Sequence, residues 1–447
     1  MSDRAEPEPA VARPTSPEPT RALFGHPPGL TVLFMTQMWA EFSYFGLQAL
    51  LVYYMTQHLG FSQARSSLIY GAYGAAAFFS PFFGGIVADR WLGRTRSVVI
   101  GALLMMCGHF AMAFEALLFP ALALVALGNG LFLPPLAVQV GDLYADDDPR
   151  QAQAFSAYYM GINLGGLLAP LVCGTLGEMY GWHWGFAAAG IGMLVGIVIY
   201  LRFRHLLPKD PPSRSQVLPG ARAALSALDW RNLRLLIAIV AVVVMFRIGY
   251  EQSGNVIALW VEHQTDRSID LFGARYEIPA TWFQSINPLL IIVLTPLLMR
   301  YWAKHAERHG PANLLSRMSL GCLVAGLSMV VMVVAAALNA RTGQPVGAGW
   351  VTAYFILLTL GELLVIPVGL TLVGALSPVQ IAAMAMGGWY IAKFLGSLLA
   401  GVMGAYWGVI PATAFFGAGA SSVLLGAILL YILGRVRPIR LGRTLPV

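Results

Sequence analysis

The residues of this sequence that could do chemistry are charged and amide side chains embedded in apolar stretches. Glu41 lies in MTQMWAEFSYFG (35–46) and is the only formally charged residue between Leu30 and Met55. In a helix rising 1.5 Å per residue, it would lie roughly 16 Å from the start, near a bilayer midplane. A carboxylate there costs at least a few kcal/mol unless it is protonated, paired or facing water. We therefore predict that Glu41 faces a cavity; the alternative is that neighbouring hydroxyls satisfy it.

Four more charged residues lie inside apolar runs, namely Arg247, Glu251, Glu362 and Lys393. Arg247 precedes Glu251 by one helical turn, and this i,i+4 spacing predicts an ion pair. We expect Lys393 to pair with Glu41, and Lys393 or Arg247 to hold an anionic group. The alternative is that both cations pair structurally or extend to the membrane surface.

The elements that must position these residues are membrane-spanning helices. The sequence is 57% hydrophobic and 11% charged, with a mean hydropathy of +0.68, whereas globular domains carry about 25% charge. Stretches long enough to cross a core of about 30 Å occur near 30–57, 66–88, 97–116, 120–142, 152–177, 183–204, 234–261, 278–302, 314–338, 349–375, 381–406 and 410–434.

These twelve stretches form two groups of six. We predict an all-α polytopic membrane protein with six-helix bundles at 29–204 and 234–434, joined by a polar linker at 205–233. The Pro- and Glu-rich residues 1–28 are expected to form a disordered cytoplasmic tail, and 435–447 a second tail. Two six-helix halves indicate a rocker-type transporter with its site near the midplane between them.

Basic residues give the orientation, because they stay on the cytoplasmic side. With the N-terminus inside, the inner segments hold 22 of the 28 lysines and arginines, so both termini are expected in the cytoplasm. The net charge of +7 is then topogenic and does not indicate nucleic-acid binding. We expect no cofactor or metal, since the three cysteines lie in apolar runs without metal-ligand spacing. No catalytic motif stands out, so enzyme activity is not expected.

The loop GGIVADRWLGRTR (84–96) combines three glycines, an acid and three arginines. The glycines would allow close backbone approach, and Asp89 could pair with an arginine or cap the next helix. Simple anchoring would explain the arginines but not the other positions. The loop resembles the signature loop of the major facilitator superfamily, and the residues concerned are Gly84, Gly85, Asp89, Arg90, Gly93 and Arg94.

Eight segments resemble, in order, the proton-dependent oligopeptide transporter family of that superfamily. They are MWAEFSYFG, GGIVADRWLG, GNGLFLPPLAVQVGDLY, AYYMGINLGGLLAPLVCG, YEQSGN, FQSINPLLIIVLTPLL, YFILLTLGELLVIPVGLTLV and GGWYIAKFLGSLLAG. The resemblance covers about residues 30–434. It implies a major facilitator fold and uptake of di- and tripeptides, or peptide-like compounds, by proton symport.

The resemblance also implies a binding site with acids for the substrate's amino terminus, cations for its carboxylate, amides and aromatics. It assigns Tyr44, Tyr73, Asn163, Glu251, Asn287, Glu362 and Trp389 to this site. The alternative for the two asparagines is an interhelical hydrogen bond, and for Tyr44 and Trp389 it is core packing.

The sequence departs from the family pattern where protons and carboxylates are usually handled. The family's first helix reads Glu-x-x-Glu-Arg-Phe, and the matching positions here are Gln37, Ala40, Glu41 and Phe42. Leu133 replaces a lysine usual in the fourth helix. The charge network would therefore be rebuilt from the other half of the protein.

The leading prediction is a monomeric secondary transporter of the bacterial plasma membrane that moves small peptides or peptide-like solutes. If protons are coupled, the expected carriers are Glu41, Glu251 and Glu362. One alternative is a proton-independent facilitator or exporter of a modified amino acid or peptide-derived natural product. Another is a sensor or scaffold that binds without transporting.

Overall fold

The computed structural model describes residues 25–145, 148–210, 227–271, 273–377, 382–437 and 439. Most of the predicted N-terminal tail (1–24), part of the linker (211–226) and most of the C-terminal tail lie outside the described residues. The remainder is almost entirely helical, as the sequence predicts.

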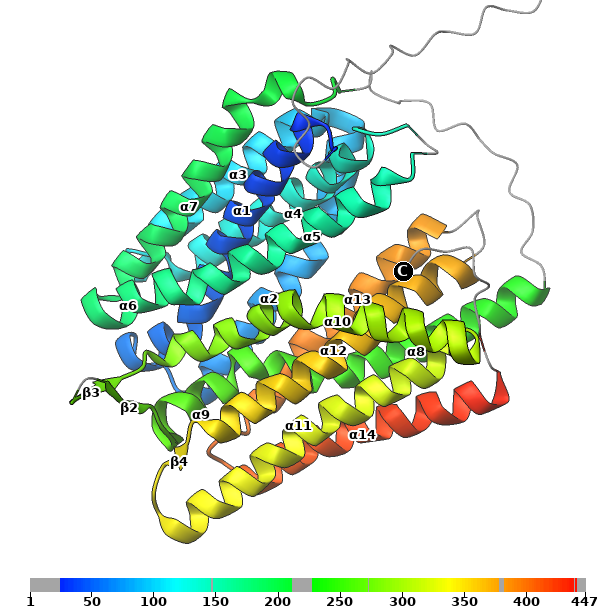
Figure 1. Ribbon diagram of the computed structural model, residues 1–447. Coiled ribbons are helices and arrows are strands. Elements are labelled where there is room, and N and C mark those ends of the chain that lie inside the picture. Colours follow the sequence, from blue (N-terminus) through cyan, green and yellow to red (C-terminus); the bar gives the residue numbers. More distant parts are fainter. Residues whose placement is uncertain are drawn as a thin grey trace, which may run out of the picture.

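The helices form two bundles, one from each half of the chain (Figure 1). The first half contains α1 (Pro28–Tyr53), α2 (Gln63–Val87), α3 (Arg94–Ala111), α4 (Leu118–Gly141), α5 (Arg150–Ala169), α6 (Thr175–Tyr180) and α7 (Trp182–Arg202). The second contains α8 (Ala227–Tyr250), α9 (Val256–Gln264), α10 (Ile286–His309), α11 (Leu314–Thr342), α12 (Gly349–Leu376), α13 (Ala382–Gly404) and α14 (Ala412–Val436).

Within the described residues, nine helical segments are long and apolar enough to cross a membrane. The helices α1, α3 and α13 pack beside them in the two bundles, and this arrangement is consistent with the twelve predicted spans. The helix α5 continues through a wider turn (Pro170–Gly174) into α6, so these two helices form one span.

The predicted span 234–261 differs from the structure in two ways. The helix α8 begins at Ala227, inside the predicted linker, and the stretch 234–261 is interrupted by a 3₁₀ turn (Glu251–Gly254). Contacts with the other half accompany the interruption. A Cβ on Gly254 would lie 2.1 Å from the Tyr70 hydroxyl, and Ser67 donates a hydrogen bond to Asn255 Oδ1 (3.0 Å). A hydropathy pattern does not predict this break, because it contains no information about contacts between helices.

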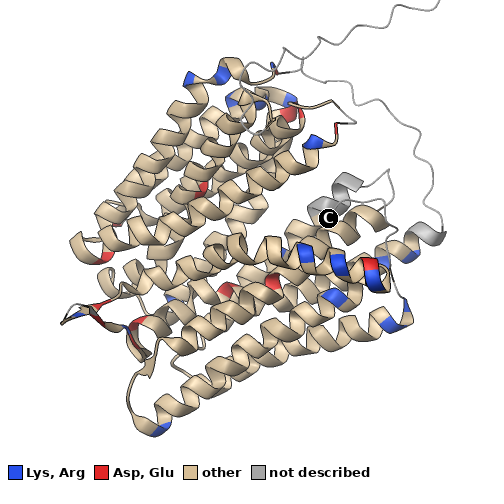
Figure 2. Cartoon of the chain, viewed as in Figure 1, with Lys and Arg blue, Asp and Glu red and all other residues tan. Residues whose placement is uncertain are grey.

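Short strands, which the all-α prediction omitted, lie in loops at one end of the molecule (Figure 1). The strand β1 (Thr265–Asp266) pairs in parallel with β4 (Val346–Gly347), and β2 (Ser268–Leu271) pairs antiparallel with β3 (Ala274–Glu277). We call this the strand end. The opposite end, where the chain passes from α7 to α8, is the linker end, and many of the lysines and arginines gather there (Figure 2).

The loop between α2 and α3 only partly follows the sequence prediction. A Cβ on Gly84 would lie 2.0 Å from the Gly130 carbonyl oxygen, so this glycine does permit close contact between α2 and α4. A Cβ on Gly85 would lie 3.8 Å from Pro134 Cβ, an ordinary van der Waals distance, so this position does not require glycine for close packing. Gly93, with φ of +76°, makes the turn into α3 in a conformation that favours glycine.

The expectation that Asp89 pairs with an arginine or caps α3 is wrong. Asp89 and Arg90 are exposed, and Asp89 has no hydrogen bond or ion pair among the described residues. Asp142 pairs with Arg94. Asp210 accepts hydrogen bonds from the Thr95 amide (3.0 Å) and hydroxyl (2.9 Å). The turn at Gly93 separates Asp89 from the start of α3. Two acids distant in the sequence therefore act in its place: Asp142 pairs with the arginine, and Asp210 caps the helix.

Candidate functional site

The two halves are joined by hydrogen bonds that lie toward the strand end. Tyr53 donates to the Ala258 carbonyl (2.9 Å), and Trp282 Nε1 donates to Thr175 Oγ1 (2.8 Å). Glu178, in α6, accepts hydrogen bonds from the Ala280 and Thr281 amides (both 2.9 Å) and from the Thr281 hydroxyl (2.6 Å). This carboxylate therefore binds the start of the 3₁₀ turn that leads into α10.

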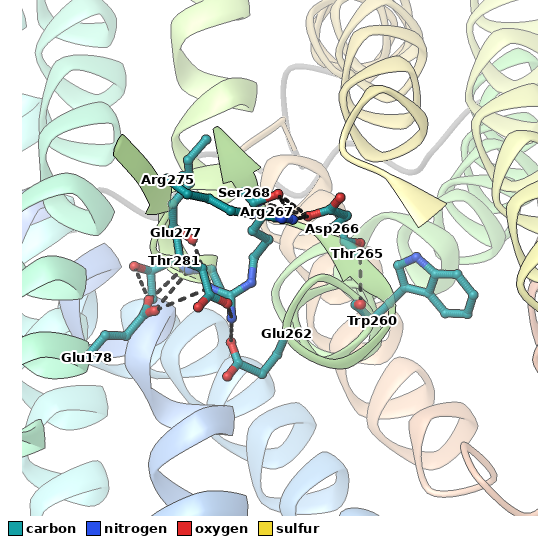
Figure 3. Close-up of polar contacts among 12 residues, drawn as sticks. Glu178, Trp260, Glu262, Thr265, Asp266, Arg267, Ser268, Arg275, Glu277 and Thr281 are labelled. Atoms are coloured by element: carbon teal, nitrogen blue, oxygen red, sulfur yellow. Dashed lines mark hydrogen bonds and ion pairs between the residues drawn. The ribbon is translucent and has the colours of Figure 1, made fainter. Parts of the chain in front are cut away.

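Arg267 adds a charge cluster at the same place (Figure 3). Its guanidinium lies 2.8 Å from Glu277, 3.3 Å from Glu262 and 4.0 Å from Glu178. It also donates to the Ile278 carbonyl (2.8 Å). Only the contact with Glu178 joins the halves, so Glu178 is the residue through which this cluster closes the strand end.

Small residues allow the halves to touch farther along the helices. A Cβ on Gly71 of α2 would lie 2.6 Å from the Gly401 Cα of α13. At the other side of the interface, Ser285 donates to the Leu167 carbonyl of α5 (2.8 Å). Among the described residues, no hydrogen bond or ion pair joins the two halves at the linker end. In the part of the chain that the structure describes, the hydrogen bonds between the halves thus lie toward the strand end.

Glu41 lies midway along α1 and is half-buried. Gln37 Nε2 donates to its Oε1 (2.7 Å), and Tyr158 of α5 donates to Gln37 Oε1 (2.7 Å). The tyrosine thus fixes the Gln37 amide with its NH2 group toward the carboxylate. Close packing of α5 on α1 supports this chain, since a Cβ on Gly165 would lie 2.3 Å from the Met38 carbonyl oxygen.

The second half contributes two acids that have polar partners, Glu251 and Glu362. Arg247 Nη1 lies 3.3 Å from Glu251 Oε1, and both side chains are 8% exposed; this confirms the predicted pair. Asn287 Nδ2 donates to Glu362 Oε2 (2.9 Å) and to Thr359 Oγ1 (2.9 Å). The structure therefore brings Asn287 and Glu362 together, as the resemblance implies.

Lys393 does not form the predicted ion pair with Glu41. Its Nζ lies 3.3 Å from the centre of the Phe78 ring in α2, and no carboxylate lies within 4.0 Å of it among the described residues. A cation over an aromatic face is stabilised by the ring quadrupole.

Aromatic residues line the same region. Tyr44 and Tyr73 stack with centroids 6.1 Å apart, and neither hydroxyl has a hydrogen-bond partner among the described residues. Trp389 is buried against α12, where a Cβ on Gly369 would lie 2.0 Å from its ring. Asn163 is buried and donates to the Tyr159 carbonyl of its own helix (3.0 Å).

Two residues of this site, Phe78 and Tyr158, were missed by sequence reasoning. Both contact a charged or polar group across helices. An aromatic residue in an apolar helix gives no sequence signal of such a contact, because core packing uses the same residues.

Comparison with known proteins decides the family. A sequence profile described as "POT family" matches residues 95–228 and 222–417. The chain belongs to the POT family. The di-/tripeptide transporter of Lactococcus lactis subsp. cremoris is 30% identical over 92% of this chain and 96% of the relative. The peptide transporter YePEPT of Yersinia enterocolitica is 32% identical over 86% and 89% of the two chains.

Solved structures agree with this assignment. A crystal structure of a mutant of the peptide transporter POT in complex with alafosfalin has a TM-score of 0.85 and 31% sequence identity, covering 94% of this chain and 96% of that one. The predicted major facilitator fold is thereby confirmed. Members of the POT family are transporters, so this chain is a membrane transporter and not an enzyme.

Proposed function

We propose that this POT family member is a secondary transporter that carries small peptides or peptide-like compounds by alternating access. The observation that carries the proposal is the central set of acids, cations, amides and aromatics between two halves whose hydrogen bonds to each other, in the described residues, lie toward the strand end. Family membership and the peptide-transporting relatives support it. Rocking of the halves would expose this set to either side in turn.

The orientation proposed from the basic residues puts the linker end, with both termini, in the cytoplasm of a bacterial cell. The conformation with the strand end closed is then the inward-facing one. We propose that a monomer is the functional unit, since each chain contains both halves of the interface.

Uptake into proteoliposomes tests the function. Purified protein is reconstituted, its orientation is resolved by impermeant labelling of an Arg341→Cys variant, and uptake of alanylalanine is followed with and without an inward proton gradient. Saturable uptake supports the proposal, and gradient stimulation shows proton symport. Binding without flux would identify the protein as a sensor, and absence of both would overturn the proposal.

A specific observation favours a second candidate, a proton-independent facilitator or exporter. Glu251 is neutralised by Arg247 one turn away in the same half, and Gln37 and Ala40 stand where acids are usual in the family pattern. Equal uptake with and without the gradient would select this candidate.

A further inference from the structure

A cavity of about 350 Å³ lies between the two halves at the strand end, and none of the central charges lines it. Its volume is at the small end of the range for small-molecule sites. The first half contributes Thr56, Phe61 and Gln63, and the second half contributes Leu259, His263 and Trp407. Because the walls come from both halves, the cavity has this shape only while the strand end is closed.

Both halves contribute an aromatic wall. Trp407 makes edge contacts with Trp260 and Phe415, with ring centroids 6.1 and 5.2 Å from its own. On the other side, the Arg65 guanidinium packs 3.9 Å from the centre of the Phe61 ring. A ring that its neighbours already hold in place loses little freedom when a ligand packs against it. The walls therefore favour a flat aromatic ligand.

Gln63 supplies a hydrogen-bond acceptor. Its Nε2 donates to the Ser67 hydroxyl (2.9 Å), and that hydroxyl donates its one proton to Asn255 Oδ1 (3.0 Å). The Ser67 oxygen must then accept from Gln63, so the amide is fixed with its NH2 group toward Ser67. Gln63 Oε1 has no donor within the described part of the chain, and it can accept a hydrogen bond from a ligand.

The lining favours a ligand without formal charge. No carboxylate, lysine or arginine is among the described residues that line the cavity. A charged group that leaves water without a partner of opposite charge pays a large desolvation penalty. A zwitterionic peptide is therefore a poor ligand here, and the cavity selects a different class of molecule from the central set.

The hydrogen bonds of Gln63 continue across the interface. Ser67 belongs to α2, whereas Asn255 lies at the break between α8 and α9. A Cβ on Gly404 of α13 would lie 2.4 Å from Asn255 Nδ2 and 2.8 Å from Ser67 Oγ, so the halves meet here without spare room. Opening of the strand end would have to break this contact and separate the cavity walls. A ligand that fits the closed walls thus favours the closed conformation.

We infer that this cavity binds a compact, uncharged aromatic molecule whose donor group binds Gln63 Oε1, and that the bound molecule keeps the strand end closed. Such a molecule is an inhibitor and not a substrate. Binding itself is independent of the proposed function, whereas the inhibition of transport rests on it.

Two probes test the binding. Indole carries a ring N–H, and N-methylindole lacks it. Their affinities are measured by calorimetry on protein in nanodiscs, with empty nanodiscs to correct for partitioning. The wild type should bind indole about threefold to tenfold more tightly, the range of one neutral hydrogen bond. This comparison needs no variant, and equal binding of the two probes by the wild type would overturn the inference.

Variants locate the hydrogen bond. Gln63→Leu should bind both probes equally, with the affinity that the wild type has for N-methylindole. Gln57→Leu is the matched control: this exposed glutamine is at the same end but lines a different cavity, so the preference for indole should remain. A preference that survives in Gln63→Leu would overturn the inference.

Counterflow of alanylalanine in proteoliposomes tests the effect on conformation. Saturating indole should abolish counterflow, because rocking requires the strand end to open. Half-inhibition by N-methylindole, or by either probe in Gln63→Leu, should need about threefold to tenfold more compound. Counterflow that continues at saturating indole would overturn the inference.

Failure of the proposed function has a different signature, namely no counterflow even without indole. Spin labels at Tyr180→Cys and Tyr276→Cys, which are exposed on opposite halves, then report the conformation. Only the short distances of the closed strand end should remain at saturating indole. Longer distances that persist or increase there would overturn the inference.

Discussion

At the residue scale, the pair of Arg247 and Glu251 is the strongest charge contact of the central interface. Both side chains are 8% exposed, so water screens them poorly. Substituting Arg247→Gln should destabilise the protein by about 3–5 kcal/mol, since it leaves a buried carboxylate uncompensated. Thermal unfolding in detergent measures this.

The double variant Arg247→Gln/Glu251→Gln should regain most of the lost stability, because it removes both charges together. Arg341→Gln, at an exposed position, should have little effect. A double variant no more stable than Arg247→Gln would show that the pair acts through something other than mutual neutralisation.

The contacts of individual residues differ in whether the sequence can predict them. The spacing of Arg247 and Glu251 is local, and one helical turn determines their proximity, so the pattern predicted the pair correctly. The partners of Lys393 and Asp89 depend on which helices pack together. Phe78 occupies the place expected for Glu41, and Asp142 and Asp210 take the roles expected for Asp89. No local pattern encodes these choices.

At the element scale, the contact of α6 with the turn before α10 closes the strand end. Glu178 accepts three hydrogen bonds there, all from the other half. Hydrogen bonds to a charged group contribute about 1.5–3 kcal/mol each. Glu178→Ala should therefore shift the population toward conformations in which the strand end is open.

Distances between spin labels at Tyr180→Cys and Tyr276→Cys, on the two halves, would measure this opening. Both positions are exposed. Glu277→Gln is the control: this carboxylate also contacts Arg267 but lies in the same half and is 70% exposed. Equal distance distributions in Glu178→Ala and the wild type would show that Glu178 does not stabilise the closed strand end.

Elements were predicted well wherever hydropathy alone defines them. The stretch 349–375 corresponds to α12, and 314–338 lies within α11. The break after Tyr250 and the strands of the loops were not predicted. The break accompanies contacts of Gly254 and Asn255 with α2, and the strands are too short for a pattern of alternating residues to emerge.

At the scale of the whole molecule, rocking preserves contacts within a half and changes those between halves. The pairs of Arg247 with Glu251 and of Asn287 with Glu362 both lie within the second half, so they can persist through the cycle. Glu41 lies in the first half, whereas the other four central charges all lie in the second half, namely Arg247, Glu251, Glu362 and Lys393. Glu41 is therefore the acid whose surroundings change most between the inward- and outward-facing states.

This asymmetry predicts which acid couples transport to protons if the wild type responds to a gradient. Glu41→Gln should abolish gradient-driven accumulation of alanylalanine yet retain exchange of saturating alanylalanine across the membrane, because a neutral amide cannot carry a proton but rocking continues. Proteoliposome uptake and counterflow measure the two quantities. Glu115→Gln, at an exposed acid paired with His58, should leave both unchanged. Accumulation that survives in Glu41→Gln would place coupling at Glu251 or Glu362, whose partners would then have to exchange within one half.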